Sequence, residues 1–211
     1  MPRLNHKSDS LPGIEIYFWK IEESVEELSY LIGDGRLLLT EAQNRFKAPA
    51  RQREWLAVRA LLQQTPYKEL EIAYHSNGKP HFGNSNKHIS ISHTQEFAAI
   101  AVADKPIGID IESKKRNAHV VADAFLQPQE IESLQARGDE KNEALRLWTA
   151  KEAAFKLSPD KSVVLKDIMA HLLANDTTEA ATYHITYKEG TIAHCHTTEE
   201  ADFVLSICTQ E

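Results

Sequence analysis

The sequence predicts a chain of mixed helices and strands that folds into two lobes, divided near Lys105. Each half of the chain begins with a strand and a helix and finishes in strands, and no low-complexity linker interrupts it. The 211 residues suffice for one large domain or two small ones, with a buried core. We therefore expect residues 1–105 and 106–211 to form the two lobes.

The first half opens with a predicted strand at Ile14–Ile21, followed by a predicted helix that starts after Ser24. Ser24 and Glu27 have the spacing of a capping box, in which each side chain accepts a hydrogen bond from the other residue's backbone N–H. Gly33 or Gly35 can end this helix.

A longer helix is predicted over Pro49–Gln64, because proline is favoured at a helix start and apolar residues recur at helical spacing. Short apolar runs follow it, and the segment SNGKP forms a turn between the first two. The predicted strands are 71–75, 88–93 and 97–103.

The second half opens with the segment PIGIDIE, residues 106–112, which we predict to be a strand. A helical zone follows over residues 120–138, and a long helix over about 139–157. The C-terminal residues alternate in the manner of strands. The predicted strands here are 181–190, 191–197 and 201–209.

The composition excludes several classes of protein. A net charge of −7, from 31 acidic and 24 basic residues, argues against a general nucleic-acid binder. No apolar run reaches the roughly 20 residues that span a membrane, and the first ten residues lack the apolar segment of a signal peptide. Two cysteines do not make a disulfide framework. We expect a cytoplasmic protein.

Two acidic residues interrupt the apolar run of the strand at residues 106–112. Asp110 and Glu112 are two residues apart, so they face the same side of a strand, while Ile109 and Ile111 face the other. Neighbouring carboxylates raise each other's pKa unless a cation lies between them, and Mg²⁺ commonly takes one or two carboxylates. The alternative is the exposed polar face of an edge strand.

A third carboxylate lies on the long helix. The spacing places Glu152 on the same face as the apolar side chains, where a charge is costly unless it is paired or bound to a metal. Lys156, four residues on, can pair with Glu152, and a simple Glu–Lys pair that reaches solvent is the alternative. Lys151 is expected nearer the solvent side. The apolar stripe comprises Leu145, Trp148 and Phe155.

Taken together, these two segments carry a more specific pattern. GIDIE, followed about 40 residues later by WTAKEAAFK, resembles the signature of the 4′-phosphopantetheinyl transferase superfamily. NGKPHF, ISISHT and RQREWLAVRALL are similar to further family motifs and occur in family order. The length is similar to that of the larger, single-chain branch. The resemblance implies an α+β fold of two similar lobes related by pseudo-twofold symmetry, with coenzyme A in the cleft between them. The first lobe, residues 1–105, would supply the residues that bind coenzyme A, and the second, residues 106–211, the metal and catalytic acids.

The resemblance also implies a reaction. Members of the family move 4′-phosphopantetheine from coenzyme A to a serine of an apo acyl or peptidyl carrier protein and release adenosine 3′,5′-bisphosphate. Asp110, Glu112 and Glu152 would hold Mg²⁺, or Mn²⁺, against the coenzyme A pyrophosphate. Glu152, or a water that it holds, would act as the base, and Lys156 would contact the phosphates. A monomer is implied.

Four further residues are implied to bind coenzyme A. Lys79 follows a glycine in a tight turn, and Ser92 and His93 end a strand. Arg53 matches the phosphate-binding arginine of the family, with Arg51 as the alternative. Without the resemblance, the lysine could belong to an ordinary hairpin, the histidine to the structural framework and the arginines to an exposed helix face.

Competing hypotheses remain open at this point. Another Mg²⁺-dependent phosphoryl-group enzyme, such as a phosphohydrolase, could use the same acids. A non-catalytic scaffold would be expected to lose the acids or Lys156, and the sequence keeps all four. The basic run SKKR, residues 113–116, follows the acidic strand, and we expect Lys114 and Lys115 to help dock an acidic carrier protein unless this run is only a solvated loop.

Overall fold

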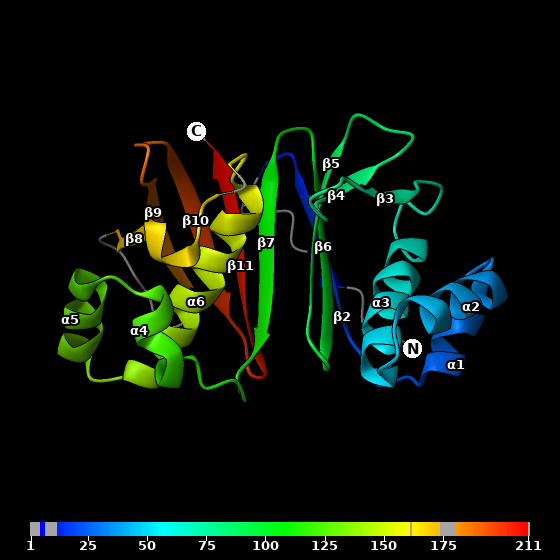
Figure 1. Cartoon of the computed structure of the whole chain (residues 1–211), viewed down its shortest axis with the longest axis horizontal. Coiled ribbons are helices and arrows are strands. Elements are labelled where there is room, and N and C mark those ends of the chain that lie inside the picture. The colour runs from blue at the N-terminus through cyan, green and yellow to red at the C-terminus, as the bar shows by residue number, and fades with distance from the viewer. Residues whose placement is uncertain (1–4, 7–11, 161, 174–179, 211) are drawn as a thin grey trace. The chain divides into compact units, whose positions relative to one another are not determined.

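The structure, a computed structural model, describes residues 5–6, 12–160, 162–173 and 180–210. The chain divides into two compact units, Met1–Asp104 and Lys105–Glu211 (Figure 1). Each unit contains a β-sheet and helices, so the predicted α+β class is confirmed. None of the helices in the described ranges combines the length and the apolar character that crossing a membrane requires.

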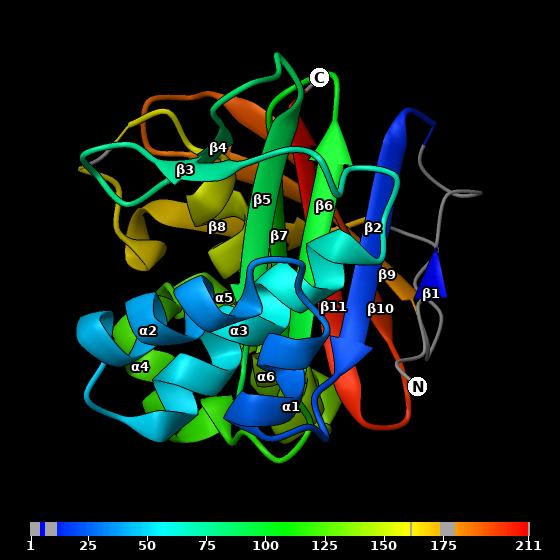
Figure 2. The same ribbon diagram turned by 90° about the vertical axis from the view of Figure 1, so that its right-hand side faces the viewer.

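The N-terminal unit is an antiparallel sheet with helices on one face. The strand order is β1-β2-β6-β5. The long helix α3 packs on β2, β5 and β6, and α1 and α2 pack against α3 (Figure 2). The elements are β1 Asn5–His6, β2 Ile14–Lys20, α1 Val25–Tyr30, α2 Gly35–Arg45, α3 Pro49–Gln63, β3 Ile72–Tyr74, β4 Pro80–Phe82, β5 His88–His93 and β6 Phe97–Ala103.

The core of this unit lies between α3 and the sheet. Trp19 of β2 and Leu56 and Leu61 of α3 are fully buried there. A buried leucine or tryptophan removes enough apolar surface from water to stabilise the fold by about 1.5–3 kcal/mol. The apolar stripe predicted for α3 therefore fixes which face of the helix meets the sheet.

The C-terminal unit is a five-stranded antiparallel sheet with the order β7-β11-β10-β9-β8. The long helix α6 packs on β7, β8, β10 and β11, and η1 and α5 pack against α6 from its other side. The elements are β7 Ile107–Ser113, η1 Ala118–Val121, α4 Ala122–Phe125, α5 Pro128–Arg137, α6 Glu140–Leu157, η2 Leu165–Asp167, β8 Ile168–Leu172, β9 Ala180–Tyr187, β10 Ile192–Glu199 and β11 Phe203–Gln210.

The two units share one order of elements. In each, an early strand (β2 or β7) pairs with the last strand of the unit (β6 or β11), and that last strand also pairs with the strand before it (β5 or β10). Three α-helices follow the early strand in both units, and the last and longest of them covers the sheet. The two similar lobes that the sequence predicts are therefore present, and their symmetry stays a prediction.

Several predicted elements need correction. The capping box of Ser24 and Glu27 forms as predicted, but α1 ends at Tyr30 and Gly35 begins a helix, α2, that was not predicted. A Cβ on Gly35 would lie 1.6 Å from the Ser29 carbonyl oxygen, so this glycine serves the close approach of α1 and α2. The short strands β4 and β8 were also not predicted, and the SNGKP turn joins β3 to β4.

Candidate functional site

A glycine brings the long helix of the C-terminal unit close to the strand that carries two of the predicted acids. Gly108 on β7 faces α6 so closely that a Cβ at this position would lie 1.9 Å from the Ala153 carbonyl oxygen. No other residue type could be accommodated without a shift of one backbone against the other. Asp110 and Glu112 follow Gly108 at intervals of two, so they face α6 as well.

Asp110 lies at the centre of this group. It is 5% exposed although β7 is an edge strand of its sheet, which excludes the exposed polar face considered above. The Lys156 ammonium donates to Asp110 Oδ1 at 2.7 Å and to the Ile109 carbonyl oxygen at 2.9 Å. Lys156 on α6 is thus tied to β7, and the expected pairing of Lys156 with Glu152 gives way to a pairing with Asp110.

Glu112 is held by two side chains that were not predicted to contact it. The Trp148 indole Nε1 donates to Glu112 Oε1 at 2.9 Å, and Arg116 Nη1 lies 3.3 Å from the same oxygen. The Arg116 guanidinium also lies 4.2 Å from the centre of the Trp148 ring. Trp148 therefore does more than fill an apolar stripe, because its one polar atom fixes an acid of β7.

Electrostatics connect Glu152 to the same group. Burial raises the pKa of the Glu152 carboxyl, and the nearby Asp110 carboxylate raises it further, while Lys156 and Arg116 oppose the rise. Burial, followed by the Asp110 charge, raises the pKa of Glu112 to about 7, against the opposing effects of Arg116, Trp148 and Lys156. One carboxylate, Asp110, thus acts on the acids of both elements.

These side chains do not form a ready-made metal site. Throughout the described ranges, no three histidine, cysteine, aspartate or glutamate side chains are arranged so that they could hold a metal ion. Lys156 is bound to Asp110, and Glu112 is bound to Trp148 and Arg116. The donor chemistry nonetheless fits a hard divalent cation, because neighbouring buried carboxylates favour a shared positive charge. Binding an ion would require these side chains to exchange partners.

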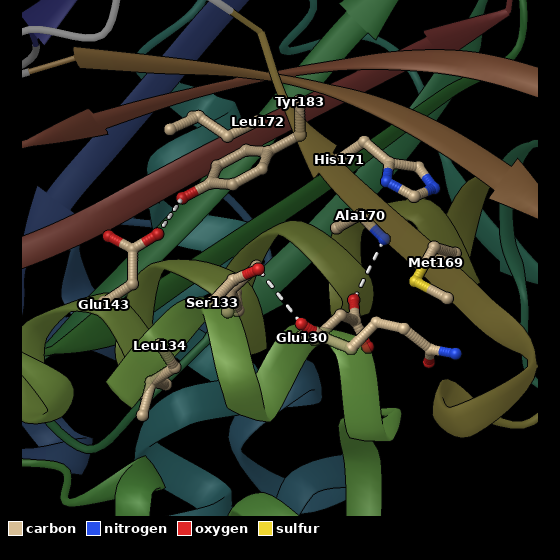
Figure 3. A pocket seen from close by; sticks show the side chains of 11 residues that line it. Glu130, Ser133, Leu134, Glu143, Met169, Ala170, His171, Leu172 and Tyr183 are labelled. Carbon is tan, nitrogen blue, oxygen red and sulfur yellow. Dashed lines mark hydrogen bonds between the residues drawn. The ribbon is translucent and has the colours of Figure 1, made fainter. Parts of the chain in front are cut away.

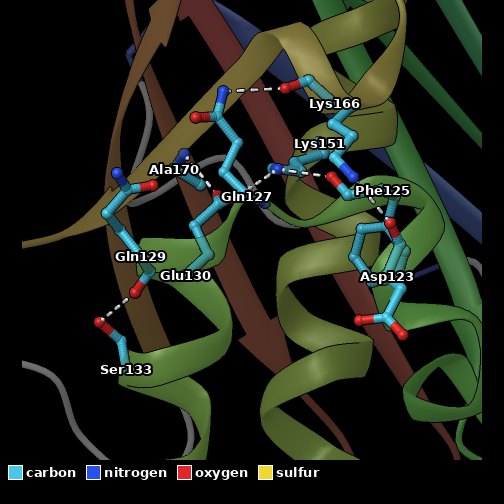
Figure 4. A network of polar contacts seen from close by, with 9 residues as sticks. All are labelled: Asp123, Phe125, Gln127, Gln129, Glu130, Ser133, Lys151, Lys166 and Ala170. Atoms are coloured by element: carbon cyan, nitrogen blue, oxygen red, sulfur yellow. Dashed lines mark hydrogen bonds and ion pairs between the residues drawn. The ribbon is translucent and has the colours of Figure 1, made fainter.

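Two expectations for the face of α6 are wrong. Phe155 is 41% exposed, and Lys151, expected near solvent, is completely buried. The Lys151 ammonium donates to Glu130 Oε2 at 2.5 Å and to the Phe125 carbonyl oxygen at 2.7 Å (Figure 4). The reason is that α6 is covered by the sheet on one side and by η1 and α5 on another, so it has more than one buried face.

A pocket of about 240 Å³ lies elsewhere in this unit, between α5, α6 and the strands β8 and β9 (Figure 3). It is lined by side chains that include Glu130, Glu143, His171 and Tyr183. The Tyr183 hydroxyl donates to Glu143 Oε1 at 3.4 Å, and Glu130 accepts from the Ala170 backbone N–H at 3.0 Å. None of the residues predicted from the sequence to form the site lines this pocket, so it carries no part of that prediction.

In the N-terminal unit, two of the predicted ligand-binding positions meet at a buried carboxylate. Glu54 on α3 is 5% exposed. Its Oε2 atom accepts a hydrogen bond from Arg51 Nη1 at 2.7 Å and lies 3.2 Å from His93 Nδ1, at the end of β5. Arg51, the alternative to Arg53, is therefore the arginine that shares a partner with His93. Glu54 was not singled out from the sequence, where it appears as one more polar residue of a helix.

Arg53 points to a different neighbour. Its guanidinium donates to the backbone carbonyl oxygen of Gln95, in the turn between β5 and β6. Arg53 and Gln95 line an open pocket of about 530 Å³, together with Gln52 and residues at the starts of α1 and α3. The first half of α3 thus meets the end of β5 and the β5–β6 turn through two separate contacts, that of Glu54 with His93 and that of Arg53 with the Gln95 carbonyl oxygen.

The remaining predicted ligand-binding residues are placed as follows. Lys79 lies in the β3–β4 turn after Gly78, whose φ of +83° favours glycine. The Lys79 backbone N–H donates to Asn77 Oδ1 at 3.1 Å, and burial lowers the pKa of the Lys79 ammonium. Ser92 is buried directly before His93. Lys79 and Ser92 therefore come from different hairpins of the unit.

Lys114, which we expected to dock a carrier protein, has a partner within the chain. Its ammonium lies 2.7 Å from Glu199 Oε1 on β10, and Arg146 of α6 binds the other oxygen of the same carboxylate. Lys115 is exposed. The basic run is therefore not a uniform solvated loop, because its first lysine joins β7 to β10.

Comparison with known proteins finds a family that the C-terminal unit resembles. A family model described as the 4′-phosphopantetheinyl transferase superfamily matches residues 106–208, which carry all the acids of β7 and α6. The chain is 33% identical over 96 residues to the 4′-phosphopantetheinyl transferase psf-1 of Bacillus pumilus, covering 44% of this chain and 41% of that protein.

Two further relatives have similar names. The chain is 38% identical over 82 residues to a 4′-phosphopantetheinyl transferase of Bacillus subtilis, covering 37% of each chain. It is 32% identical over 107 residues to the 4′-phosphopantetheinyl transferase gsp of Aneurinibacillus migulanus, covering 49% of this chain and 45% of that protein. The chain thus spans about two fifths of the length of these curated relatives. Residues 106–208, which make up most of the C-terminal unit, are thus similar to the 4′-phosphopantetheinyl transferase superfamily.

Proposed function

We propose that this protein transfers the 4′-phosphopantetheine group of coenzyme A to a serine hydroxyl of an apo acyl or peptidyl carrier protein. The serine oxygen forms a bond to the phosphorus of the phosphopantetheine phosphate. The bond from that phosphorus to the bridging oxygen of the pyrophosphate breaks, and adenosine 3′,5′-bisphosphate leaves. The serine proton goes to a base.

One observation carries this proposal. Within the residues that match the family, the charge of Asp110 acts on both Glu112, its neighbour on β7, and Glu152 on α6. Acids from two elements thereby share one electrostatic environment, as a site for a diphosphate and its counter-ion requires. Gly108 supports the arrangement by allowing α6 to approach β7.

Glu152 and Lys156 would act on the reacting groups. A base works best when its pKa is near the working pH, and burial together with Asp110 raises the pKa of Glu152 toward that range. Glu152, or a water that it orients, would therefore take the serine proton. Lys156 would bind phosphate oxygens as a point charge after exchanging part of its contact with Asp110.

We also propose that Asp110, Glu112 and Glu152 hold Mg²⁺, or Mn²⁺ in its place. When bound, such an ion offsets the negative charge that develops on the leaving phosphate. The role of the protein would be to supply oxygen ligands of the kind that hard cations prefer and to release Glu112 from Arg116 and Trp148.

Coenzyme A would be held mainly by the N-terminal unit. Lys79 offers an ammonium next to a glycine turn, and Ser92 and His93 lie at the end of β5. Arg53 faces the open pocket by the β5–β6 turn. We assign residues 1–105 to coenzyme A binding and residues 106–211 to the metal and the catalytic acids.

We place the protein in the cytoplasm as a monomer. Cys195 and Cys208 face each other on neighbouring strands and are both free thiols, in keeping with a reducing compartment. The proposed partners are coenzyme A and a carrier protein, with neither a nucleic acid nor a membrane involved. The excess of acidic residues is consistent with this choice.

Mass spectrometry tests the proposed reaction directly. Apo acyl and peptidyl carrier proteins are incubated with the protein, coenzyme A and Mg²⁺, and the intact carrier mass is measured. We expect the mass of one phosphopantetheine to appear on the carrier serine, and not on a carrier whose serine is replaced by alanine. Unchanged masses for all carriers would contradict the proposal.

The same assay separates the competing functions. A phosphohydrolase would release phosphopantetheine from coenzyme A in the absence of carrier, whereas the proposed transferase would release adenosine 3′,5′-bisphosphate only in its presence. A non-catalytic scaffold would do neither. The presence of all three acids and Lys156 favours the transferase over a scaffold.

A further inference from the structure

Glu54 is a buried acid that the proposed reaction does not use. It lies on α3 with its side chain 7% exposed, whereas Arg51 beside it is 61% exposed. A buried carboxylate is costly unless it is well paired. Glu54 gains its pairing at a single atom, Oε2, which contacts Arg51 at 2.7 Å and His93 at 3.2 Å.

The contact with Glu54 constrains the His93 ring. An ionised carboxylate can only accept hydrogen bonds, so the ring atom that faces it, Nδ1, must carry the hydrogen. A neutral ring with hydrogen on Nδ1 has only a lone pair on Nε2, whereas the imidazolium carries hydrogen on both nitrogens and can donate from Nε2 while Nδ1 donates to Glu54. A partner on one ring nitrogen thereby fixes both the tautomer and the orientation of the other, as with metal-bound and catalytic histidines.

His93 lies where a ligand can reach the ring that Glu54 orients. His93 ends β5, directly before the β5–β6 turn, and its side chain is 33% exposed, so a ligand can reach the ring. Glu54 belongs to α3, whose packing on β5 and β6 sets its position. A rigid helix thus orients a partly exposed ring at the end of a strand.

We propose that Glu54 is a positioning residue, which accepts a hydrogen bond from Nδ1–H of His93 so that Nε2–H of the imidazolium is presented to a phosphate oxygen of coenzyme A. This inference rests on the proposed function, because it takes His93 to bind that substrate. Glu54 itself does not touch the ligand. Its loss would remove the hydrogen bond that fixes Nδ1, and the entropy of ordering the ring would then oppose binding more strongly.

Nuclear magnetic resonance of the wild-type protein gives the first test. Two-dimensional ¹H–¹⁵N spectra of the histidine rings, assigned with His93→Ala, identify which nitrogen carries the hydrogen at a pH where His93 is neutral. We expect hydrogen on Nδ1 in the wild type. Hydrogen on Nε2 would overturn the proposal without any variant having to fold.

Binding of coenzyme A, measured by calorimetry, gives the second test. Glu54→Ala and His93→Ala should each weaken binding about tenfold, and the double variant should be no weaker than either single one, since both remove the same contact. Glu54→Gln keeps an oxygen that can accept from Nδ1, so it should bind within about threefold of the wild type. Independent effects that multiply to about a hundredfold would overturn the proposal.

A matched control separates positioning from general destabilisation. Glu15, on β2 of the same unit, accepts hydrogen bonds from the hydroxyls of Tyr17 and Tyr67. Glu15→Ala removes a comparable carboxylate, so it should lower the melting temperature and leave both the His93 tautomer and coenzyme A binding unchanged. An equal loss of affinity in this variant would overturn the proposal in favour of a purely structural role for Glu54.

The outcome of these measurements does not depend on whether the proposed transfer reaction occurs. Because they record the ring tautomer and the dissociation constant, they do not require transfer to a carrier. Wild-type protein that binds coenzyme A with coupled Glu54 and His93, yet modifies no carrier, would contradict the reaction and support the positioning role. Transfer that proceeds with Glu54 and His93 uncoupled would contradict the positioning role alone.

Discussion

Glu112 is a carboxylate whose surroundings oppose its ionisation. Its side chain is 13% exposed, and burial together with Asp110 raises its pKa to about 7 from an ordinary value of 4.5. Because the folded protein holds the proton more tightly than the unfolded chain, Glu112 contributes stability below about pH 4.5. That contribution is lost as the pH rises through 7.

Replacement by the neutral isostere should therefore stabilise the metal-free protein at high pH. We expect Glu112→Gln to raise the free energy of unfolding by roughly 1–3 kcal/mol at pH 8 and by much less at pH 4.5, since Gln keeps an oxygen for the Trp148 indole. Urea unfolding in EDTA at the two pH values measures this. A variant that is less stable than the wild type at pH 8 would show that Glu112 is not electrostatically strained.

Lys151 and Glu130 form a second buried charge pair, whose role is structural. Glu130 also accepts from the backbone N–H groups of Gln127 and Ala170, so it joins the start of α5 to β8 (Figure 4). Lys151→Ala should reduce the free energy of unfolding by about 3–5 kcal/mol, because Glu130 would stay buried without its cation.

Lys188→Ala is the control for this change. The Lys188 side chain is 77% exposed, and its Nζ atom lies 3.8 Å from Asp167 Oδ1. Its loss should therefore lower the free energy of unfolding by less than about 0.5 kcal/mol. Chemical denaturation compares the two variants. Equal and small effects would mean that the Lys151–Glu130 pair is not needed for the packing of α5 and α6.

At the scale of elements, the contact between β7 and α6 is what assembles the acids. Gly108→Ala would place a methyl carbon 1.9 Å from the Ala153 carbonyl oxygen and force α6 away from β7. We expect a loss of about 2–3 kcal/mol in the free energy of unfolding, from overpacking. Lengthening of the contact between Lys156 and Asp110 in a crystal structure of the variant should accompany it.

Gly33→Ala serves as the comparison, because a Cβ at Gly33 meets no atom within 4 Å. The free energy of unfolding of Gly33→Ala should lie within about 0.5 kcal/mol of the wild-type value. If Gly108→Ala is equally well tolerated and Lys156 keeps its distance from Asp110, then close packing at Gly108 does not position the acids.

Periodicity was a sound guide to the long elements. The apolar stripe of α3, the capping box of α1 and the strand β7 all follow from local spacing, which the tertiary structure preserves. The helix α2 was missed because it is polar on most positions and largely exposed, so no stripe marks it. The strands β4 and β8 are short, and each is defined by its pairing with the neighbouring strand, β3 or β9, rather than by an apolar pattern of its own.

The site was predictable only in part. The sequence singled out Asp110, Glu112, Glu152 and Lys156, but no spacing rule indicates that Lys156 binds Asp110 across two elements. Glu54 was missed because it contacts His93 only through the folding of β5 onto α3. Lys151 and Phe155 were placed wrongly because the prediction gave α6 a single buried face. The helices that also pack on α6 cannot be inferred from the sequence of α6 alone.

At the scale of the whole molecule, one order of elements carries two different sets of polar side chains. In the C-terminal unit, the early strand β7 and the long helix α6 carry acids. In the N-terminal unit, the corresponding long helix α3 carries arginines and the Glu54 carboxylate that contacts His93. Because the core of each unit lies between its helix and its sheet, residues at the ends of these elements can differ without loss of the fold.

The central claim is that acids of β7 and α6 bind one divalent cation. A crystal structure of the protein with coenzyme A and Mn²⁺, with anomalous diffraction locating the metal, tests this most directly. We predict a single strong peak about 2 Å from oxygen atoms of Asp110, Glu112 and Glu152, and its absence from the Asp110→Asn/Glu112→Gln/Glu152→Gln variant. Bound coenzyme A with no metal peak beside these three residues, or with a peak elsewhere, would contradict the account.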